Sequence, residues 1–238
     1  MTRPFNFVQL VESLLAGIRF IPQTLAEAFV AYLVCLVIGF LLAVLRVWGP
    51  RWLDVVLQVV FSIVKALPAY LVFLVGALLV TLYGQSVFHA LHLGIDASAI
   101  DMRYVATGVL AFLYLPAVSE AFRGGLLSVP SGQIEAGETV GLTWGQIVRR
   151  IVIPQMIPES IPALTNVLLT LVKTASLGIL IGAVDVLNSA VNAASQSYDY
   201  LEGYLAAALI YWCICVVLEF AMGRLAGWTG RFKAVASV

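Results

Sequence analysis

Long runs of uncharged, mostly apolar residues divide the chain into segments of membrane length. Four such runs cover residues 28–45, 66–95, 104–119 and 203–218. A fifth segment, residues 160–184, carries one charge, on Lys173 near its middle. About 20 residues of apolar helix are needed to cross a bilayer core. The pattern therefore predicts an all-α integral membrane protein with five transmembrane helices.

The segment from Arg51 to Tyr83 is too long for one straight transmembrane helix. Its 33 residues would extend about 50 Å, whereas a hydrocarbon core is about 30 Å thick. The sequence Lys65-Ala66-Leu67-Pro68 predicts a break, because proline is tolerated in the first turn of a helix but not in its interior. We expect an interfacial helix over about residues 52–64 and a transmembrane helix after it.

Basic residues lie mostly in alternate connections, which predicts the orientation of the chain. The expected spans are about residues 25–46, 67–83, 104–121, 160–183 and 203–224, within a single domain of residues 1–238. The basic residues on one side are Arg46, Arg51, Arg123, Arg149, Arg150, Arg224, Arg231 and Lys233. Because Lys and Arg favour cytoplasmic loops, we expect the N-terminus outside and the C-terminus in the cytoplasm. The start of the chain lacks the pattern of a removable signal peptide.

The composition excludes several classes of function. The chain is 62% hydrophobic and 11% charged, with a mean hydropathy of +1.02, whereas a soluble domain has about 25% charged residues. Thirteen Lys and Arg balance thirteen Asp and Glu, so the chain has no basic field for nucleic acid. Cys35, Cys213 and Cys215 all lie in apolar runs and predict no disulfide framework.

The longest predicted cytoplasmic connection, residues 122–159, has the pattern of two short helices. Pro130 and Ser131 predict the start of the first helix, with the Ser131 hydroxyl as its N-terminal cap. Gly141 predicts its end, because glycine readily takes the left-handed conformation that closes a helix.

A second helix is predicted to start directly afterwards. Thr143 and Gln146 have the spacing of a capping box, and Pro154 is expected to end the helix. The apolar residues of the two helices are expected to form one surface that is too large to leave in water. They are Ile134, Val140, Trp144 and Ile147.

The spacing within this connection resembles a family motif. The residues are Glu135, Ala136, Gly137, Gly141, Ile151 and Pro154. With these intervals they resemble the cytoplasmic coupling motif of ATP-binding-cassette (ABC) importer permeases. Flanking segments are similar to the polar amino-acid permeases of that family, which carry histidine, glutamine, cystine or opines. These segments are residues 65–68, 122–133, 164–166, 173–177 and 204–211, and the resemblance covers about residues 24–225.

Three positions depart from the family pattern. Gly137 replaces an alanine, which weakens helix propensity by roughly 1 kcal/mol. Lys65 replaces an arginine, and Thr174 with Ala175 stands where Asp and Thr are usual. The missing carboxylate beside Lys173 leaves cationic, neutral and sulfur-containing amino acids open as substrates.

The resemblance implies a type I ABC importer permease fold, with the coupling helices between spans three and four, over about residues 131–154. It implies a bacterial inner-membrane subunit that imports polar amino acids or related derivatives. Its implied partners are an ABC ATPase dimer, a second identical or homologous permease, an extracytoplasmic binding protein and membrane lipid. The permease itself would have no catalytic residues and bind no metal or cofactor, with ATP and Mg held by the ATPase subunits. The chain also lacks the phosphate-binding loop of ATPases.

Polar residues on the fifth apolar segment are candidates for the substrate path. They are Asn166, Thr170, Lys173, Thr174 and Ser176, and the first, second and fourth share one helix stripe with Lys173 beside it. A cation in mid-span is a functional candidate by default. Lys173 would contact a substrate carboxylate, hold a gate through an ion pair, or have a structural role.

Two other classes of membrane protein fit the sequence less well. An intramembrane hydrolase is disfavoured because His89 and His92 lack the spacing of a zinc hydrolase, and Ser176 near Lys173 has no evident oxyanion site. A membrane scaffold would explain the spans but not the full coupling pattern. Glu120 and Arg123, three residues apart, are expected to form an ion pair. Residues 188–200 are expected to form an outer loop, which either contacts the binding protein or is only a polar loop.

Overall fold

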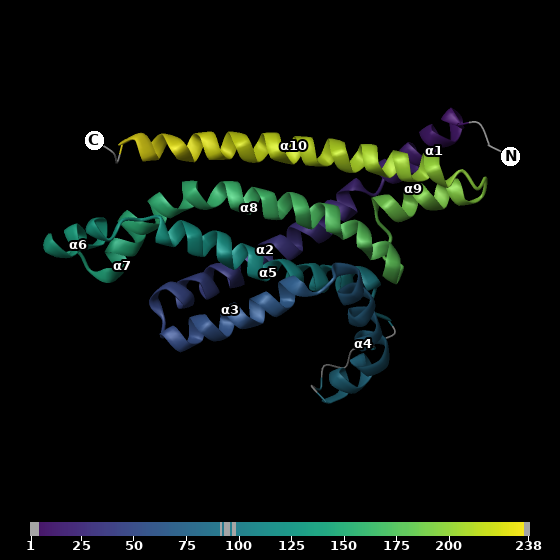
Figure 1. Cartoon of the computed structure of the whole chain (residues 1–238). Coiled ribbons are helices and arrows are strands. Elements are labelled where there is room, and N and C mark those ends of the chain that lie inside the picture. The colour runs from purple at the N-terminus through teal and green to yellow at the C-terminus, as the bar shows by residue number, and fades with distance from the viewer. Residues whose placement is uncertain (1–4, 91, 93–95, 97–98, 236–238) are drawn as a thin grey trace. The chain divides into compact units, whose positions relative to one another are not determined.

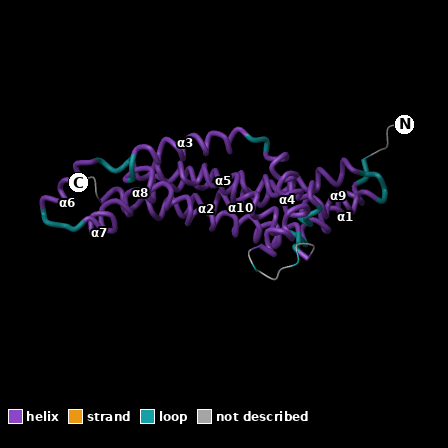
Figure 2. The backbone as a smooth tube through the Cα atoms, turned by 90° about the horizontal axis from the view of Figure 1, so that it is seen from below, coloured by secondary structure: helices purple, strands orange, loops and turns teal. Residues whose placement is uncertain are grey.

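A computed structural model describes residues 5–90, 92, 96 and 99–235, and within them it contains helices and no strand (Figures 1 and 2). The α-helices are α1 (Phe7–Ile18), α2 (Ile21–Trp48), α3 (Arg51–Ala66), α4 (Ala69–Ala90), α5 (Met102–Leu127), α6 (Ser131–Thr139), α7 (Trp144–Ile147), α8 (Ile153–Ala175), α9 (Val186–Ser195) and α10 (Tyr200–Val235). A π-helix, η2 (Val148–Val152), precedes α8, and a 3₁₀ helix, η3 (Ser176–Ile181), follows it.

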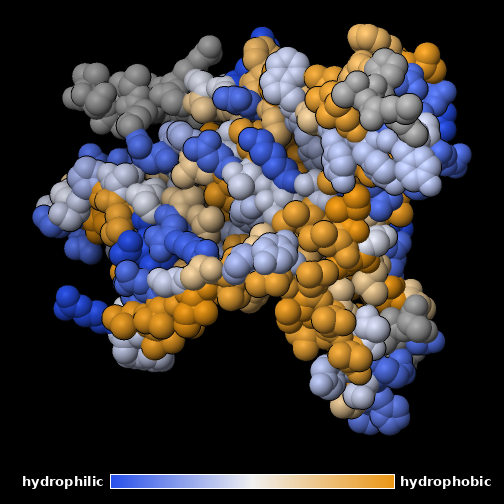
Figure 3. All heavy atoms as spheres, turned by 45° about the vertical axis from the view of Figure 1, so that its right-hand side comes forward, coloured by the Kyte–Doolittle hydropathy of each residue, from blue (hydrophilic) through white to orange (hydrophobic). Residues whose placement is uncertain are grey.

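Five helical stretches are long and apolar enough to cross a membrane, which confirms the predicted number. They are α2, α4, α5, the continuous run Trp144–Ile181 and the stretch Tyr200–Trp228 of α10. No more than 39% of the most apolar window of any of them is buried by the chain itself. Much of the surface visible in Figure 3 is therefore hydrophobic, as lipid-facing helices require.

The predicted break in the second apolar segment lies where proline requires it. Helix α3 ends at Ala66 and α4 begins at Ala69, so Pro68 precedes the first turn of α4. Helix α3 buries Phe61 and Val64 and leaves much of its opposite face exposed. The exposed face includes the apolar residues Val55, Val59 and Ile63, and the interfacial position of this helix stays a prediction.

Two helices were not expected from the sequence. Helix α1 precedes the first span, and α9 replaces the outer loop that was expected over residues 188–200. Both helices form because their first turns have side-chain caps. The Asn6 side chain accepts a hydrogen bond from the Gln9 N–H at 3.2 Å, and the Asp185 side chain accepts one from the Asn188 N–H at 2.7 Å. Helices α1 and α9 pack side by side, which supplies the tertiary contacts that such short helices need (Figure 1).

The chain divides into two compact units. Unit 1 comprises Met1–Tyr32, Leu67–Leu113 and Thr170–Val216, and unit 2 comprises Leu33–Ala66, Tyr114–Leu169 and Val217–Val238. In unit 1, Ala190, Ala206 and Ala207 form a small core against Leu10, Leu14 and Leu187. The core of unit 2 joins the end of α2, the end of α5 and the segment from α6 to the start of α8.

Helices α5 and α8 approach closely in unit 2 because Gly125 has no side chain. A Cβ atom at this position would lie 2.8 Å from the Met156 carbonyl oxygen and would collide with the Ser160 hydroxyl. The neighbouring Gly124 has open space at its own Cβ position. The two glycines therefore differ in packing while sharing one helix.

We predict opposite effects of alanine at these two glycines. Gly125→Ala should destabilise the protein by about 1–3 kcal/mol because the contact with a backbone oxygen cannot relax cheaply. Gly124→Ala should be neutral or stabilising by up to about 1 kcal/mol through helix propensity alone. Thermal unfolding of the two variants in detergent checks this. Equal midpoints would show that α5 and α8 do not pack as described.

Candidate functional site

Helices α6 and α7 are held on unit 2 by a glycine packed against two isoleucines. Gly137 is buried, and a Cβ atom there would lie 2.9 Å from Ile151 Cδ1 and 3.1 Å from Ile147 Cγ1. Ile147 is fully buried in the unit 2 core, and Ile151 packs against that core. Gly137 thus brings α6 close to the segment that follows, in place of the alanine usual at this position in the resembled motif.

Gly141 ends α6 in the predicted way. Its φ is +80°, in the left-handed region, and its N–H donates to the Glu138 carbonyl at 2.9 Å. The Leu142 N–H then donates to the Gly137 carbonyl at 3.0 Å. The start of α6 differs from expectation: Pro130 is its N-cap, and the Ser131 hydroxyl makes no capping hydrogen bond because Ser131 is already the first helical residue.

The second short helix begins as predicted but does not end at Pro154. The Thr143 N–H donates to Gln146 Oε1 at 2.9 Å, as part of the predicted capping box. Helix α7 continues through η2 into α8, so Pro154 lies in the first turn of α8. The wider π turn of η2 precedes the proline, where an ordinary helix would meet a ring clash and a missing N–H donor.

The four apolar residues expected to share one surface are separated in the structure. Ile147 is fully buried and Ile134 packs against the same core, whereas Val140 is 74% exposed. Trp144 packs edge-on against Trp48, with ring centroids 5.2 Å apart. The predicted surface is therefore only partly present: Ile134 and Ile147 meet in the core, whereas Val140, at the end of α6 next to Gly141, stays exposed.

Most of the motif residues face outward. Glu135, Ala136, Gly141 and Pro154 are exposed, whereas Ile151 is half-buried and Gly137 is buried. Beside them a polar pocket of about 560 Å³ is lined by Thr143, Gly145, Gln146, Arg149 and Arg150. This surface presents the Glu135 carboxylate and the two arginines, while its underside is anchored in the core of unit 2.

A buried arginine next to this segment was missed from the sequence. Arg46 Nε donates to Asp54 Oδ1 at 2.8 Å, and Arg46 Nη1 donates to Glu120 Oε1 at 2.9 Å. The expected Glu120–Arg123 pair is therefore wrong, since Glu120 pairs with Arg46 and Arg123 lies 4.0 Å from Asp54. In the sequence, Arg46 is only a cation at the end of an apolar span. Its partners lie on two other helices, so the sequence pattern does not indicate them.

The proposed substrate-path residues lie on and just after α8. Asn166, Thr170 and Lys173 are exposed, and Thr174 is half-buried. Ser176 is the first residue of η3 rather than part of α8, and its hydroxyl donates to the Lys173 carbonyl at 2.8 Å. An exposed lysine in a membrane-length helix must meet water, a partner charge or another polar surface.

A second polar cluster in unit 1 was also missed. Asp185 is fully buried, and its Oδ2 accepts from the Tyr211 hydroxyl at 3.1 Å. Thr24 Oγ1 accepts from the Val186 N–H at 3.2 Å, and Glu27 is buried with one oxygen lacking a hydrogen-bond partner. Burial raises the pKa of Asp185, which lies outside the membrane-length helices, to about 6.

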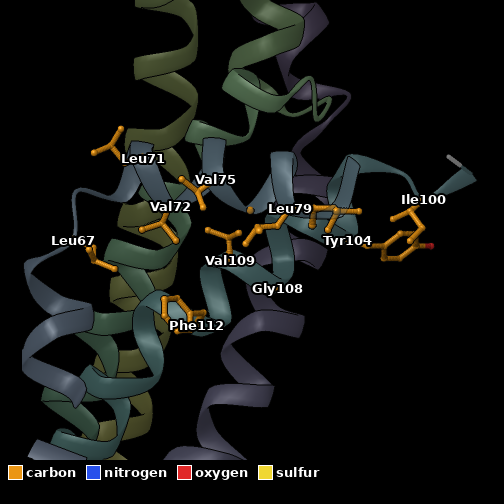
Figure 4. A pocket seen from close by; sticks show the side chains of 13 residues that line it. Leu67, Leu71, Val72, Val75, Leu79, Ile100, Tyr104, Gly108, Val109 and Phe112 are labelled. Carbon is orange, nitrogen blue, oxygen red and sulfur yellow. The ribbon is translucent and has the colours of Figure 1, made fainter. Parts of the chain in front are cut away.

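An apolar pocket in unit 1 is poorly suited to a charged solute. It has a volume of about 870 Å³ and lies between α4 and α5, lined by Leu71, Val75, Val109, Phe112 and their neighbours (Figure 4). Its lining side chains include one polar group, the Tyr104 hydroxyl. Charged ends of an amino acid would be left unpaired there, at a large desolvation cost. Among the described residues, no group of three His, Cys, Asp or Glu side chains could hold a metal.

The fold and the anchored motif segment define a class of membrane transport subunit. The chain belongs to the family described as the binding-protein-dependent transport system inner membrane component, whose family model matches residues 35–230. Members are permease subunits of ABC importers, in which separate subunits hydrolyse ATP. The chain is thus a multi-pass inner-membrane permease subunit of an amino-acid ABC importer, and not an enzyme.

Named relatives match most of their own length. The probable amino-acid ABC transporter permease protein PatM of Vibrio harveyi is 28% identical over 90% of this chain and 92% of its own. The octopine transport system permease protein OccM of Rhizobium radiobacter is 32% identical over 93% of this chain and 87% of its own. The L-cystine transport system permease protein TcyL of Bacillus subtilis (strain 168) is 29% identical, over 84% of this chain and 82% of its own.

Solved structures show the same fold. A chain of an amino acid ABC transporter crystallised with histidines has a TM-score of 0.74 at 23% identity, covering 95% of this chain and 99% of that chain. A chain of the inward-facing MetNI methionine ABC transporter has a TM-score of 0.70 at 23% identity, covering 89% and 95%. These likenesses confirm the type I importer permease fold.

The buried Asp185 predicts a dependence of stability on pH. Its pKa is raised in the folded protein from 3.8 to about 6, so the folded state holds the proton more tightly than the unfolded state. Stability should therefore be greatest below about pH 4 and decrease by about 3 kcal/mol as the pH rises to about 6. Asp185→Asn keeps a capping oxygen and should remove this decrease. Unfolding midpoints between pH 4 and pH 7 check this, and parallel curves for the two proteins would contradict it.

Proposed function

We propose that residues 131–154 form the coupling segment through which this permease contacts its ATPase subunits. One observation carries the proposal: the segment is fixed to the unit 2 core through Gly137, Ile147 and Ile151, while Glu135 and Ala136 face outward. A surface that is rigidly held below and exposed above is suited to transmit a push from a partner. Glu135 then acts in docking or at the helix start and not as a catalytic acid.

The arginine pocket supplies charge for the same contact. Arg149 and Arg150 line it together with Gln146, and no carboxylate lines it. A groove of the ATPase that presents acidic side chains would complement this pocket, because arginine binds carboxylates through two parallel hydrogen bonds. Closing of the ATP sites would thereby move the helices of the permease as rigid bodies.

We further propose that the cargo is a polar amino acid or a related derivative, and that Asn166, Thr170, Lys173, Thr174 and Ser176 contribute to its path. Relatives are named for amino acids, L-cystine and octopine, which all carry ammonium and carboxylate groups. Lys173 is exposed on a membrane-length helix and can meet a carboxylate there. The apolar pocket between α4 and α5 offers no comparable partner.

The remaining assembly follows from the same proposal. Two permease subunits, identical or homologous, would sit on an ATPase dimer that holds ATP and Mg, with the N-terminus outside and the C-terminus in the cytoplasm. An extracytoplasmic binding protein would deliver the amino acid, in keeping with the family's description.

Reconstitution with the ATPase and the binding protein encoded beside this chain tests the proposed function. ATP hydrolysis is measured in proteoliposomes against a panel of cationic, neutral and sulfur-containing amino acids and opines. We expect stimulation by one compound or one chemical class, which would also identify the cargo. An intact complex that no compound stimulates would contradict the proposal of a polar amino-acid importer.

Gly141 provides a test of the coupling segment. Gly141→Leu should cost about 1–2 kcal/mol through its left-handed backbone, since open space surrounds its Cβ position. We expect this variant to reach the membrane but to lose ATPase subunits during purification, or to hydrolyse ATP without uptake. Gly141→Asn, which tolerates this conformation, is the matched control. Normal uptake by Gly141→Leu would refute the coupling role.

Lys173 provides a test of the substrate path. Lys173→Met should raise the amino-acid concentration for half-maximal stimulation about tenfold or more, because a charge-assisted hydrogen bond is lost. Lys173→Arg keeps the charge and should retain most of the affinity. An unchanged half-maximal concentration in Lys173→Met would assign Lys173 a structural role.

A further inference from the structure

The last turn of α2 binds two other helices through one side chain. Arg46 presents different nitrogens to Asp54, in the first turn of α3, and to Glu120 on α5, at 2.8 Å and 2.9 Å. The Arg46 side chain is only 2% exposed, and its guanidinium carbon lies 5.3 Å from the centre of the Phe61 ring. Hydrogen bonds to a desolvated guanidinium in two directions fix both partners in place.

The same turn also touches the coupling segment. Trp48, two residues after Arg46, packs edge-on against Trp144 at the start of α7. Ala43, one turn before Arg46, belongs to the core that includes Ile147. Helix α5 reaches the segment from the other side, because Leu126 and Val129 lie in this core just before α6. Arg46 therefore links the end of α2 to α3 and α5, and both α2 and α5 contribute residues to the core beneath the segment.

We infer that Arg46 is a positioning residue that makes the ends of α2, α3 and α5 move with the coupling segment as one rigid body. The inference rests on the proposed coupling function and adds the residue that transmits it. A displacement of α6 and α7 is transmitted to α2 through the contact between Trp144 and Trp48. The hydrogen bonds of Arg46 then transmit it to α3 and α5. Without Arg46, the segment can move while these helices stay behind.

The chemistry of the cluster explains why another residue cannot replace Arg46 easily. Asp54 and Glu120 are both carboxylates, and Arg123 lies 4.0 Å from Asp54, beyond hydrogen-bond distance. Without the Arg46 guanidinium, the carboxylates of Asp54 and Glu120 lose their shared partner, and their like charges repel each other. A lysine would restore one charge but not the two fixed hydrogen-bond directions.

The first test separates coupling from folding. Arg46→Gln, Arg46→Lys and Glu120→Gln are reconstituted with the ATPase and the binding protein, and amino-acid uptake is measured per ATP hydrolysed. We expect Arg46→Gln to lower this ratio about tenfold while basal ATP hydrolysis continues, with smaller losses in the other two variants. Arg51→Gln is the matched control, because Arg51 is an exposed arginine five residues away.

The second test follows the rigid body directly and needs no transported substrate. Spin labels are placed at the exposed positions Val56 of α3 and Glu138 of α6 after the three cysteines are replaced. The distance between the labels is measured in the assembled complex with and without ATP. We expect one unchanged distance in the otherwise native chain and a distance that broadens or shifts with ATP in Arg46→Gln.

The outcomes are distinct. A wild-type uptake ratio in folded, assembled Arg46→Gln would overturn the inference, and so would a native distance that changes with ATP. If Arg46→Gln fails to assemble, Glu120→Gln decides, because its side chain is 36% exposed and its loss disturbs folding less. If no amino acid stimulates the native complex, the proposed function fails, and the label distances still decide the role of Arg46.

Discussion

A bilayer core offers no hydrogen-bond partner to a backbone N–H or C=O group, and the rest of the structure depends on that constraint. All membrane-length segments are helical, so their backbone groups pair internally. Polar side chains on these helices are costly and are found where a specific partner or role exists. The clearest example is Arg46, near the end of α2, with its two carboxylate partners.

The proposed coupling segment, residues 131–154, meets a different physical constraint, because it is polar on its exposed side and packs on a hydrophobic core. Small residues achieve this: Gly137 lets α6 lie directly on Ile147 and Ile151, and Gly141 turns the chain within a few residues. The π turn of η2 then carries the chain past Pro154 into α8 without a break. The exposed surface is thus continuous along the chain with α8.

The departures from the family pattern acquire physical meaning in this setting. Gly137 lowers helix propensity, but a Cβ atom at this position would lie only 2.9 Å from the Cδ1 atom of Ile151. Thr174 removes a carboxylate next to Lys173, and its hydroxyl instead donates to the Thr170 carbonyl at 2.9 Å. Lys173 therefore has no neighbouring carboxylate at position 174, which suits the role that we propose for it in meeting the carboxylate end of a cargo.

The sequence by itself determined the class of fold, the number of spans, the break before Pro68 and the turn at Gly141. Each of these is local, since it depends on apolar length or on the backbone preference of one residue. The partners of Arg46, the burial of Asp185 and the separation of Val140 from Ile147 were decided only by tertiary structure. These features join residues far apart in the chain, and a one-dimensional pattern of polar and apolar positions does not state which helices meet. Helices α1 and α9 belong to the same group, because such short helices need to pack against each other in addition to having N-terminal caps.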